Sequence, residues 1–193
     1  MTKIIIGIKS PLYGSRGIEK NDLSKIANHL STNEIAILND NSIQAIKVSQ
    51  IKINSGHWID GIQFTYKITK DNKNSLVEGH KFGCNGGGQR IINLGDNEHL
   101  IRIDGKIKGN VDELKFLTFD TDKNKTITYG KFGGEHQTSS FEIFSEKLIY
   151  PLICFFGRSS ENSLSGIGVY EGNISLFEEK FQSQIEILPP YKR

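Results

Sequence analysis

Hydrophobic positions repeat with a period of two along most of the chain. The runs Gln50–Asn54 and Ile62–Tyr66 alternate apolar and polar residues strictly, and residues 100–103, 114–119 and 167–170 follow the same trend. Such alternation is typical of strands with one buried face, and β-branched and aromatic residues favour it. Clusters rich in Gly, Asn and Asp separate about ten such segments, at intervals of roughly 8–15 residues. The pattern therefore predicts an all-β barrel, sandwich or prism.

Two segments depart from this period. Within Asn21–Leu30, apolar residues fall at helical spacing after a capping Asn or Asp, which predicts a short helix of about two turns. From residue 173 onward apolar residues again share one helical face, although residues 185–188 also fit a strand, and Pro189-Pro190 ends any regular element. We therefore predict one β domain over residues 1–172, with a helical insertion at about 18–42 and a C-terminal extension at 173–193. No internal repeat is evident.

Composition narrows the class of protein. The chain has 193 residues, 24 Lys and Arg, 22 Asp and Glu and a formal net charge of +2. Because a nucleic-acid or membrane-surface protein needs a one-sided basic patch, neither partner is expected. No apolar run approaches the ~18–20 residues of a membrane span, and the N-terminal apolar run is too short for a signal peptide. We therefore expect no membrane insertion and a cytoplasmic or non-classically released protein.

Four runs of sequence, in order, carry a resemblance to a known family. They are SGHWIDGIQFTYK (55–67), EGHKFGCNGGGQRIINL (78–94), LKFLTFDTDKNKTITYGKFGG (114–134) and LICFFGRSSENSLSGIGVY (152–170). Together they resemble the jacalin-related lectins. The resemblance implies a β-prism of three Greek-key four-stranded sheets and a non-catalytic protein that binds glycans, of the mannose/glucose or galactose type, through exposed loops at one end. Glycine suits such loops because backbone N–H groups can then approach sugar hydroxyls closely.

The resemblance also implies which residues bind the sugar. The family's first glycine-rich loop corresponds to Leu12–Gly17, and its acidic loop corresponds to residues 160–165. A polar loop at 120–126 lies where related lectins tune specificity. The candidate carbohydrate-binding residues are Gly14, Ser15, Gly17, Asp122, Glu161, Asn162, Ser163, Leu164 and Ser165. For these loops to form one pocket, Gly14–Gly17 must lie beside Ser163–Ser165.

One position departs from the family pattern. Ser165 follows Leu164 where the family has Asp, so the usual carboxylate is missing, and Glu161 in the lengthened loop is the available substitute. A carboxylate accepts stronger, charge-assisted hydrogen bonds than a hydroxyl. We therefore expect weak or atypical binding of mannose/glucose-type sugars. The alternative is a protein-interaction or assembly module that keeps the fold without sugar binding, with the C-terminal extension joining a homo-oligomer or a protein partner.

Other motifs add no second chemistry. Trp58 is expected either to stack on a sugar ring or to pack on the prism. The loop that begins at Asp120 has Lys125 at the position where a calcium loop needs Gly, so it does not fit that site. No nucleophile has a recognisable acid–base partner and the five histidines are scattered. We expect no enzyme activity, no metal and no cofactor.

Overall fold

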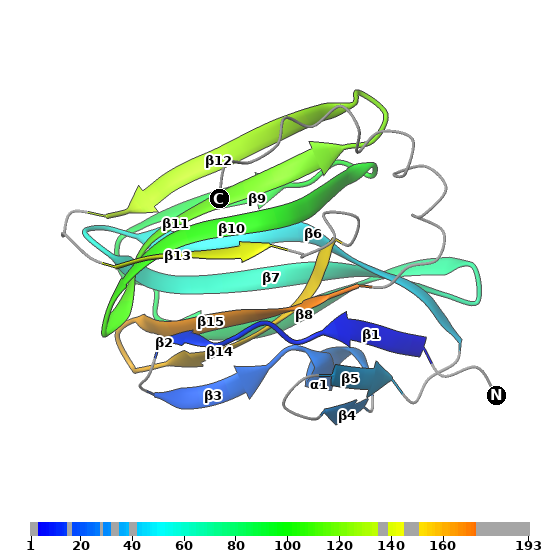
Figure 1. Ribbon diagram of the computed structural model, residues 1–193, viewed down its shortest axis with the longest axis horizontal. Helices are drawn as coiled ribbons and strands as arrows, with labels where there is room; N and C mark the ends of the chain where they lie inside the picture. The colour runs from blue at the N-terminus through cyan, green and yellow to red at the C-terminus, as the bar shows by residue number, and fades with distance from the viewer. Residues whose placement is uncertain are drawn as a thin grey trace.

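Three four-stranded antiparallel sheets form the body of the molecule. The computed structural model describes residues 4–14, 17–27, 29–31, 35–38, 42–134, 139–144 and 151–172 (Figure 1). These contain fifteen strands and one short helix. The all-β fold and the three four-stranded sheets are confirmed. The predicted C-terminal extension, 173–193, lies outside the described residues.

Two of the sheets are complete Greek keys. The first has the order β8-β7-β6-β9, built from β6 (Ile43–Ser55), β7 (Ile59–Lys70), β8 (Lys73–Gly83) and β9 (Gly88–Asn93). The second has the order β12-β11-β10-β13, built from β10 (Glu98–Lys108), β11 (Asn110–Asp120), β12 (Lys125–Gly133) and β13 (Ser139–Phe144). In each, three consecutive strands pair and the fourth returns beside the first.

The third sheet joins both ends of the described chain. Its order is β2-β15-β14-β3, with β2 (Tyr13–Gly14), β3 (Ile18–Asn21), β14 (Leu152–Ser159) and β15 (Leu164–Glu171). The expected insertion at 18–42 therefore begins with a strand of the prism, because β3 pairs with β14 from Ile18↔Ser159 to Asn21↔Phe156. The domain limits themselves stay a prediction.

A small fourth sheet was not expected. It has the order β1-β5-β4, with β1 (Ile4–Ile8), β5 (Ile35–Leu38) and β4 (His29–Ser31). The predicted helix over Asn21–Leu30 is correspondingly too long: α1 covers only Leu23–Ile26. Ala27 is extended and the chain then pairs as β4, so strand pairing replaces the rest of the helix.

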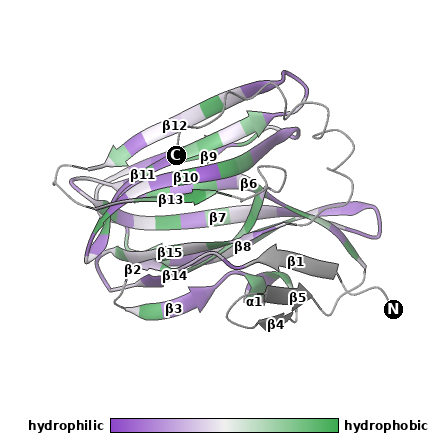
Figure 2. Ribbon diagram, viewed as in Figure 1, coloured by the Kyte–Doolittle hydropathy of each residue, from purple (hydrophilic) through white to green (hydrophobic). Residues whose placement is uncertain are grey.

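Strand number was underestimated for a physical reason. Five of the six residues of β9 are exposed, and β8 and β12 bury few residues, because these are edge strands. Edge strands therefore give a weak hydrophobic alternation in the sequence. The inner strands alternate clearly, and Figure 2 shows hydrophobic and hydrophilic residues interleaved along them.

The core lies where the inner faces of the three sheets meet. Phe64 of the first sheet stacks on Phe155 of the third, with ring centroids 3.5 Å apart and an interplanar angle of 5°. Phe116 of the second sheet belongs to the same cluster and is fully buried. No helix in the described part of the chain is long and apolar enough to cross a membrane.

A buried carboxyl group ties the short helix to the first sheet. Asp22, at the start of α1, is fully buried; its Oδ2 accepts a hydrogen bond from Tyr66 Oη (2.5 Å) and its Oδ1 accepts one from the His80 backbone N–H (2.6 Å). Burial raises the pKa of Asp22 from 3.8 to about 6, although the Tyr66 and His80 hydrogen bonds act in the opposite direction. Asp22 is therefore partly ionised near neutral pH at a cost to stability.

This raised pKa predicts a pH-dependent stability. Between about pH 4 and pH 6 the folded chain keeps a proton that the unfolded chain has released, so the Asp22 contribution to stability falls as pH rises. Relative to Asp22→Asn, the free energy of unfolding of the wild type should fall by about 2 kcal/mol between pH 4 and pH 7. Urea unfolding at both pH values measures this. As a control, the free energy of unfolding of Asp71→Asn, in the exposed β7–β8 turn, should change with pH as that of the wild type does. If the free energy of unfolding of Asp22→Asn also changed with pH as the wild type does, the assignment would be contradicted.

Candidate functional site

One end of the prism gathers the turns of the three central hairpins, β6–β7, β10–β11 and β14–β15. We call it the hairpin end; its turns are residues 56–58, 109 and 160–163, and it lies at the left of Figure 1. Two contacts connect neighbouring sheets there: the Gly134 N–H donates to His57 O (3.1 Å), and Cys84 Sγ donates to Asn162 O (3.3 Å). The turns are thus held in one fixed group.

The structure brings the two predicted sugar loops together. Gly14 pairs with Gly166, and a Cβ on Gly14 would lie only 2.0 Å from Ser165 O. Gly17 is similarly close to Ser159 O. Both glycines have positive φ, so the backbone itself lies against the β14–β15 turn. Ser15 lies outside the described residues.

The serine hydroxyls of this loop are engaged with the loop itself. Ser165 is 0% exposed, and its Oγ accepts a hydrogen bond from the Ser160 N–H (3.2 Å). Ser163 is 4% exposed, and its Oγ lies 3.0 Å from Ser160 Oγ. Leu164 is buried in the core. Ser160, Glu161 and Asn162 are the exposed residues of the turn, so a ligand at this loop would meet them and the backbone.

Asp122 lies away from the other predicted residues. It is in the β11–β12 turn, at the opposite end of the eleven-residue strand β11 from the β10–β11 turn (Figure 1). Its Oδ2 accepts a hydrogen bond from Asn97 Nδ2 (2.5 Å). Eleven extended residues span roughly 35 Å. The expectation that Asp122 joins a pocket with residues 160–165 is therefore corrected.

Sequence reasoning missed an acidic residue at the hairpin end. Asp60 is the second residue of β7, directly after Ile59. Its carboxylate faces the glycine-rich loop between β8 and β9. A Cβ on Gly86 would lie 2.8 Å from Asp60 Oδ1, and one on Gly87 would lie 2.6 Å from Oδ2. Within the described residues no hydrogen bond to this carboxylate is present. The two carboxylate oxygens of the half-buried Asp60 thus lie beside the backbone of Gly86 and Gly87, which carries no side chain.

An internal repeat would have revealed Asp60. Ser55–Ile62 (SGHWIDGI) and Ser160–Ile167 (SENSLSGI) share Ser, Gly and Ile at three positions, with Asp60 where the other has Ser165. The repeat is structural as well, since three times a positive-φ glycine packs on the carbonyl of the equivalent residue. The pairs, with the distance from a Cβ on the glycine to that oxygen, are Gly14 and Ser165 (2.0 Å), Gly83 and Asp60 (2.1 Å), and Gly133 and Asp112 (2.2 Å). The statement that no repeat is evident is thereby corrected.

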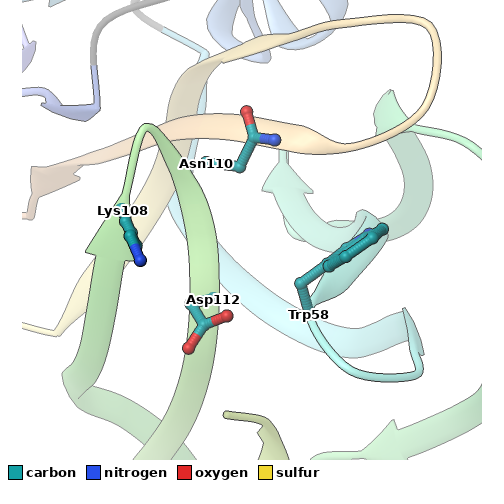
Figure 3. A pocket seen from close by; sticks show the side chains of 4 residues that line it. All are labelled: Trp58, Lys108, Asn110 and Asp112. Carbon is teal, nitrogen blue, oxygen red and sulfur yellow. The ribbon is translucent and has the colours of Figure 1, made fainter. Parts of the chain in front are cut away.

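A hollow of about 270 Å³ opens between the β6–β7 and β10–β11 hairpins. Trp58, from the β6–β7 turn, borders it together with Lys108, Asn110 and Asp112 of the β10–β11 hairpin (Figure 3). Trp58 is 44% exposed, so its ring is not buried on the prism. Trp58 was expected either to stack on a sugar ring or to pack on the prism, and its half-exposed ring leaves a face accessible to a ligand.

A second hollow, of about 220 Å³, lies at the opposite end. Its lysines are already engaged: Lys47 Nζ donates to Gly95 O and to Asp96 O (2.6 Å), and Lys67 Nζ donates to Asp96 Oδ1 (2.7 Å). Burial lowers the pKa of Lys47 to about 8 and that of the bordering His99 to about 3. The ammonium groups at this hollow are therefore already engaged by backbone carbonyls and by Asp96. In the described part of the chain no three His, Cys, Asp or Glu side chains are grouped to hold a metal ion.

Comparison with known proteins places this geometry in a family. The sequence model of the jacalin-like lectin domain matches residues 14–170. Among solved structures, Malaysian Banana Lectin is 24% identical with a TM-score of 0.59, over 86% of this chain and 99% of the lectin. AcmJRL, a mannose-binding jacalin-related lectin from Ananas comosus, is 25% identical with a TM-score of 0.58, over 86% and 98%. Calystegia sepium agglutinin shares the fold at 18% identity and a TM-score of 0.56, over 86% and 96%. The chain therefore belongs to the jacalin-like lectin domain family, a family of carbohydrate-binding proteins.

Proposed function

We propose that this domain is a non-catalytic lectin that binds mannose/glucose-type sugars at the hairpin end, with Asp60 as the principal acceptor. The observation that carries the proposal is the contact between the Asp60 carboxylate and the glycine backbone at Gly86 and Gly87. A pyranose presents adjacent hydroxyl groups that both donate and accept. The carboxylate accepts two of their hydrogen bonds, and the loop backbone offers the Gly87 N–H, since the Gly86 N–H already donates to Cys84 Sγ (3.3 Å).

The strength of such a site follows from its size. Each hydrogen bond contributes only ~0.5–1.5 kcal/mol net, and somewhat more when one partner is charged. A few bonds in a shallow site therefore give a few kcal/mol, which corresponds to a dissociation constant on the order of 1 mM. We expect weak binding of single sugars.

The β14–β15 loop, which resembles the family's usual site, contributes less to sugar affinity than Asp60 in this proposal. Ser165 carries no charge, and its oxygen already accepts the Ser160 N–H. Glu161 is exposed in the same turn, whereas the half-buried Asp60 carboxylate lies against the backbone at Gly86 and Gly87. The β14–β15 loop would therefore contribute little to affinity.

The choice of sugar rests on similarity. AcmJRL is described as mannose-binding, and artocarpin, which shares the fold at 17% identity, has been solved with a mannopentose. These properties belong to those proteins and make mannosides the first ligands to test here. The alternative, an assembly module without sugar binding, is favoured by the missing acid at Ser165, but Asp60 supplies an acid in the equivalent turn.

Removal of the Asp60 charge should abolish sugar binding. Asp60→Asn keeps the shape of the side chain but weakens both acceptor bonds, and we expect at least a tenfold loss of affinity for methyl α-mannoside by calorimetry. Asp71→Asn, at the other end of the prism, is the matched control and should bind normally. Unchanged binding by Asp60→Asn, or no saccharide response from the wild type at millimolar concentration, would overturn the proposal.

The internal repeat predicts that a second site can be built. Ser165→Asp places a carboxylate at the position equivalent to Asp60, beside Gly14. Calorimetry should then show an additional mannoside site, so that stoichiometry rises from one to two per chain. Ser165→Asn, of equal size without the charge, is the control and should leave stoichiometry at one. Because position 165 is fully buried, thermal melts must first show that both variants fold.

A further inference from the structure

The hollow between two hairpins has the chemistry of a sugar subsite. Lys108 and Asn110 border it with exposed polar groups, and Asp112 borders it from β11 with a carboxyl that is only 5% exposed (Figure 3). An ammonium donates, an amide both donates and accepts, and a carboxylate accepts. Trp58 adds an aromatic face. Hydroxyl-rich rings with one apolar face are the ligands that such a combination suits.

The position of Trp58 is fixed by its backbone rather than by burial of its ring. The Gly56 N–H donates to Trp58 O (3.1 Å) and closes the turn, and Gly133 packs against the Trp58 carbonyl carbon. The indole itself stays 44% exposed. An aromatic side chain has only two rotatable side-chain torsions, so it loses little conformational entropy when a ligand stacks on it.

The hollow and Asp60 lie on either side of one short turn. Trp58 precedes Asp60 by two residues, so their Cα atoms are at most about 7 Å apart. Asp60 contacts the Gly86–Gly87 backbone, whereas Trp58 borders the β10–β11 hairpin. The two side chains thus face different loops, and a ligand that places one ring against each of them is a disaccharide or longer.

From this geometry we infer that the hollow bordered by Trp58, Lys108, Asn110 and Asp112 binds the second residue of an oligosaccharide whose terminal residue is held at Asp60. The inference rests on the proposed function of Asp60 and adds the ligand class, namely an oligosaccharide rather than a monosaccharide. The volume agrees with one further ring, since about 270 Å³ is just below the ~300–1,000 Å³ typical of sites for whole small molecules. A linear ligand then gains contacts from two hairpins instead of one.

The test compares the affinity of an α-linked mannobiose with that of methyl α-mannoside. We expect the wild type to bind the disaccharide about fivefold more tightly. In Trp58→Ala this gain should fall below twofold, while affinity for methyl α-mannoside stays within twofold of the wild type. Trp58→Phe keeps an aromatic face and should keep most of the gain. Asn110→Ala, on the opposite hairpin, should reduce the gain two- to threefold without affecting the monosaccharide.

Controls separate this inference from the function on which it rests. Leu76→Ala removes another exposed apolar side chain (70% exposed) from β8 and should change neither affinity. Asp60→Asn should lose both ligands; if it keeps both, the proposed function itself fails. If Asp60→Asn loses both but the wild type shows no preference for the disaccharide, only the subsite is wrong. Retention of the gain in Trp58→Ala, or an equal loss for both sugars, also overturns the subsite.

Discussion

The fold depends on the mutual burial of three amphipathic hairpins. No single sheet encloses a core, because each presents its apolar face to the other two; the stacked pair Phe64 and Phe155 and the buried Phe116 come from three different sheets. Burial of one such side chain contributes roughly 1.5–3 kcal/mol, so loss of any sheet would expose the inner faces of the others. This shared core fixes the directions of all three hairpins, and their turns consequently meet at one end.

The proposed sugar site lies at that shared end, outside the core. Hydrogen bonds from the Gly134 N–H to His57 O and from Cys84 Sγ to Asn162 O link one sheet's loops to its neighbour's turns. A weak sugar site needs this rigidity, because a few hydrogen bonds cannot also offset the entropy of ordering a mobile loop. The glycines bring backbone close to the acceptor, and the core holds it there.

Three equivalent turns carry three different local chemistries. Asp60 is half-buried beside bare backbone, Asp112 is nearly buried at the edge of a hollow, and Ser165 is fully buried with its oxygen engaged. The same backbone contact with a glycine is present in each. A common scaffold therefore leaves the choice of side chain and its burial to decide which turns bind a ligand.

The sequence by itself determined the fold class and the proximity of two loops. Alternation along residues 50–54 and 62–66 identified the strands because side chains of period two must face one core, and the resemblance of four runs identified the three sheets. Edge strands such as β9 escaped because they bury little, and the helix over 21–30 was too long because pairing of β4 with β5 is a non-local contact. The repeat of Ser55–Ile62 in Ser160–Ile167 could have pointed to Asp60, whereas the hollow beside Trp58 and the separation of Asp122 from the hairpin end exist only in the tertiary structure. Distances between turns more than fifty residues apart are set by the packing of whole sheets, which no local pattern in the chain records.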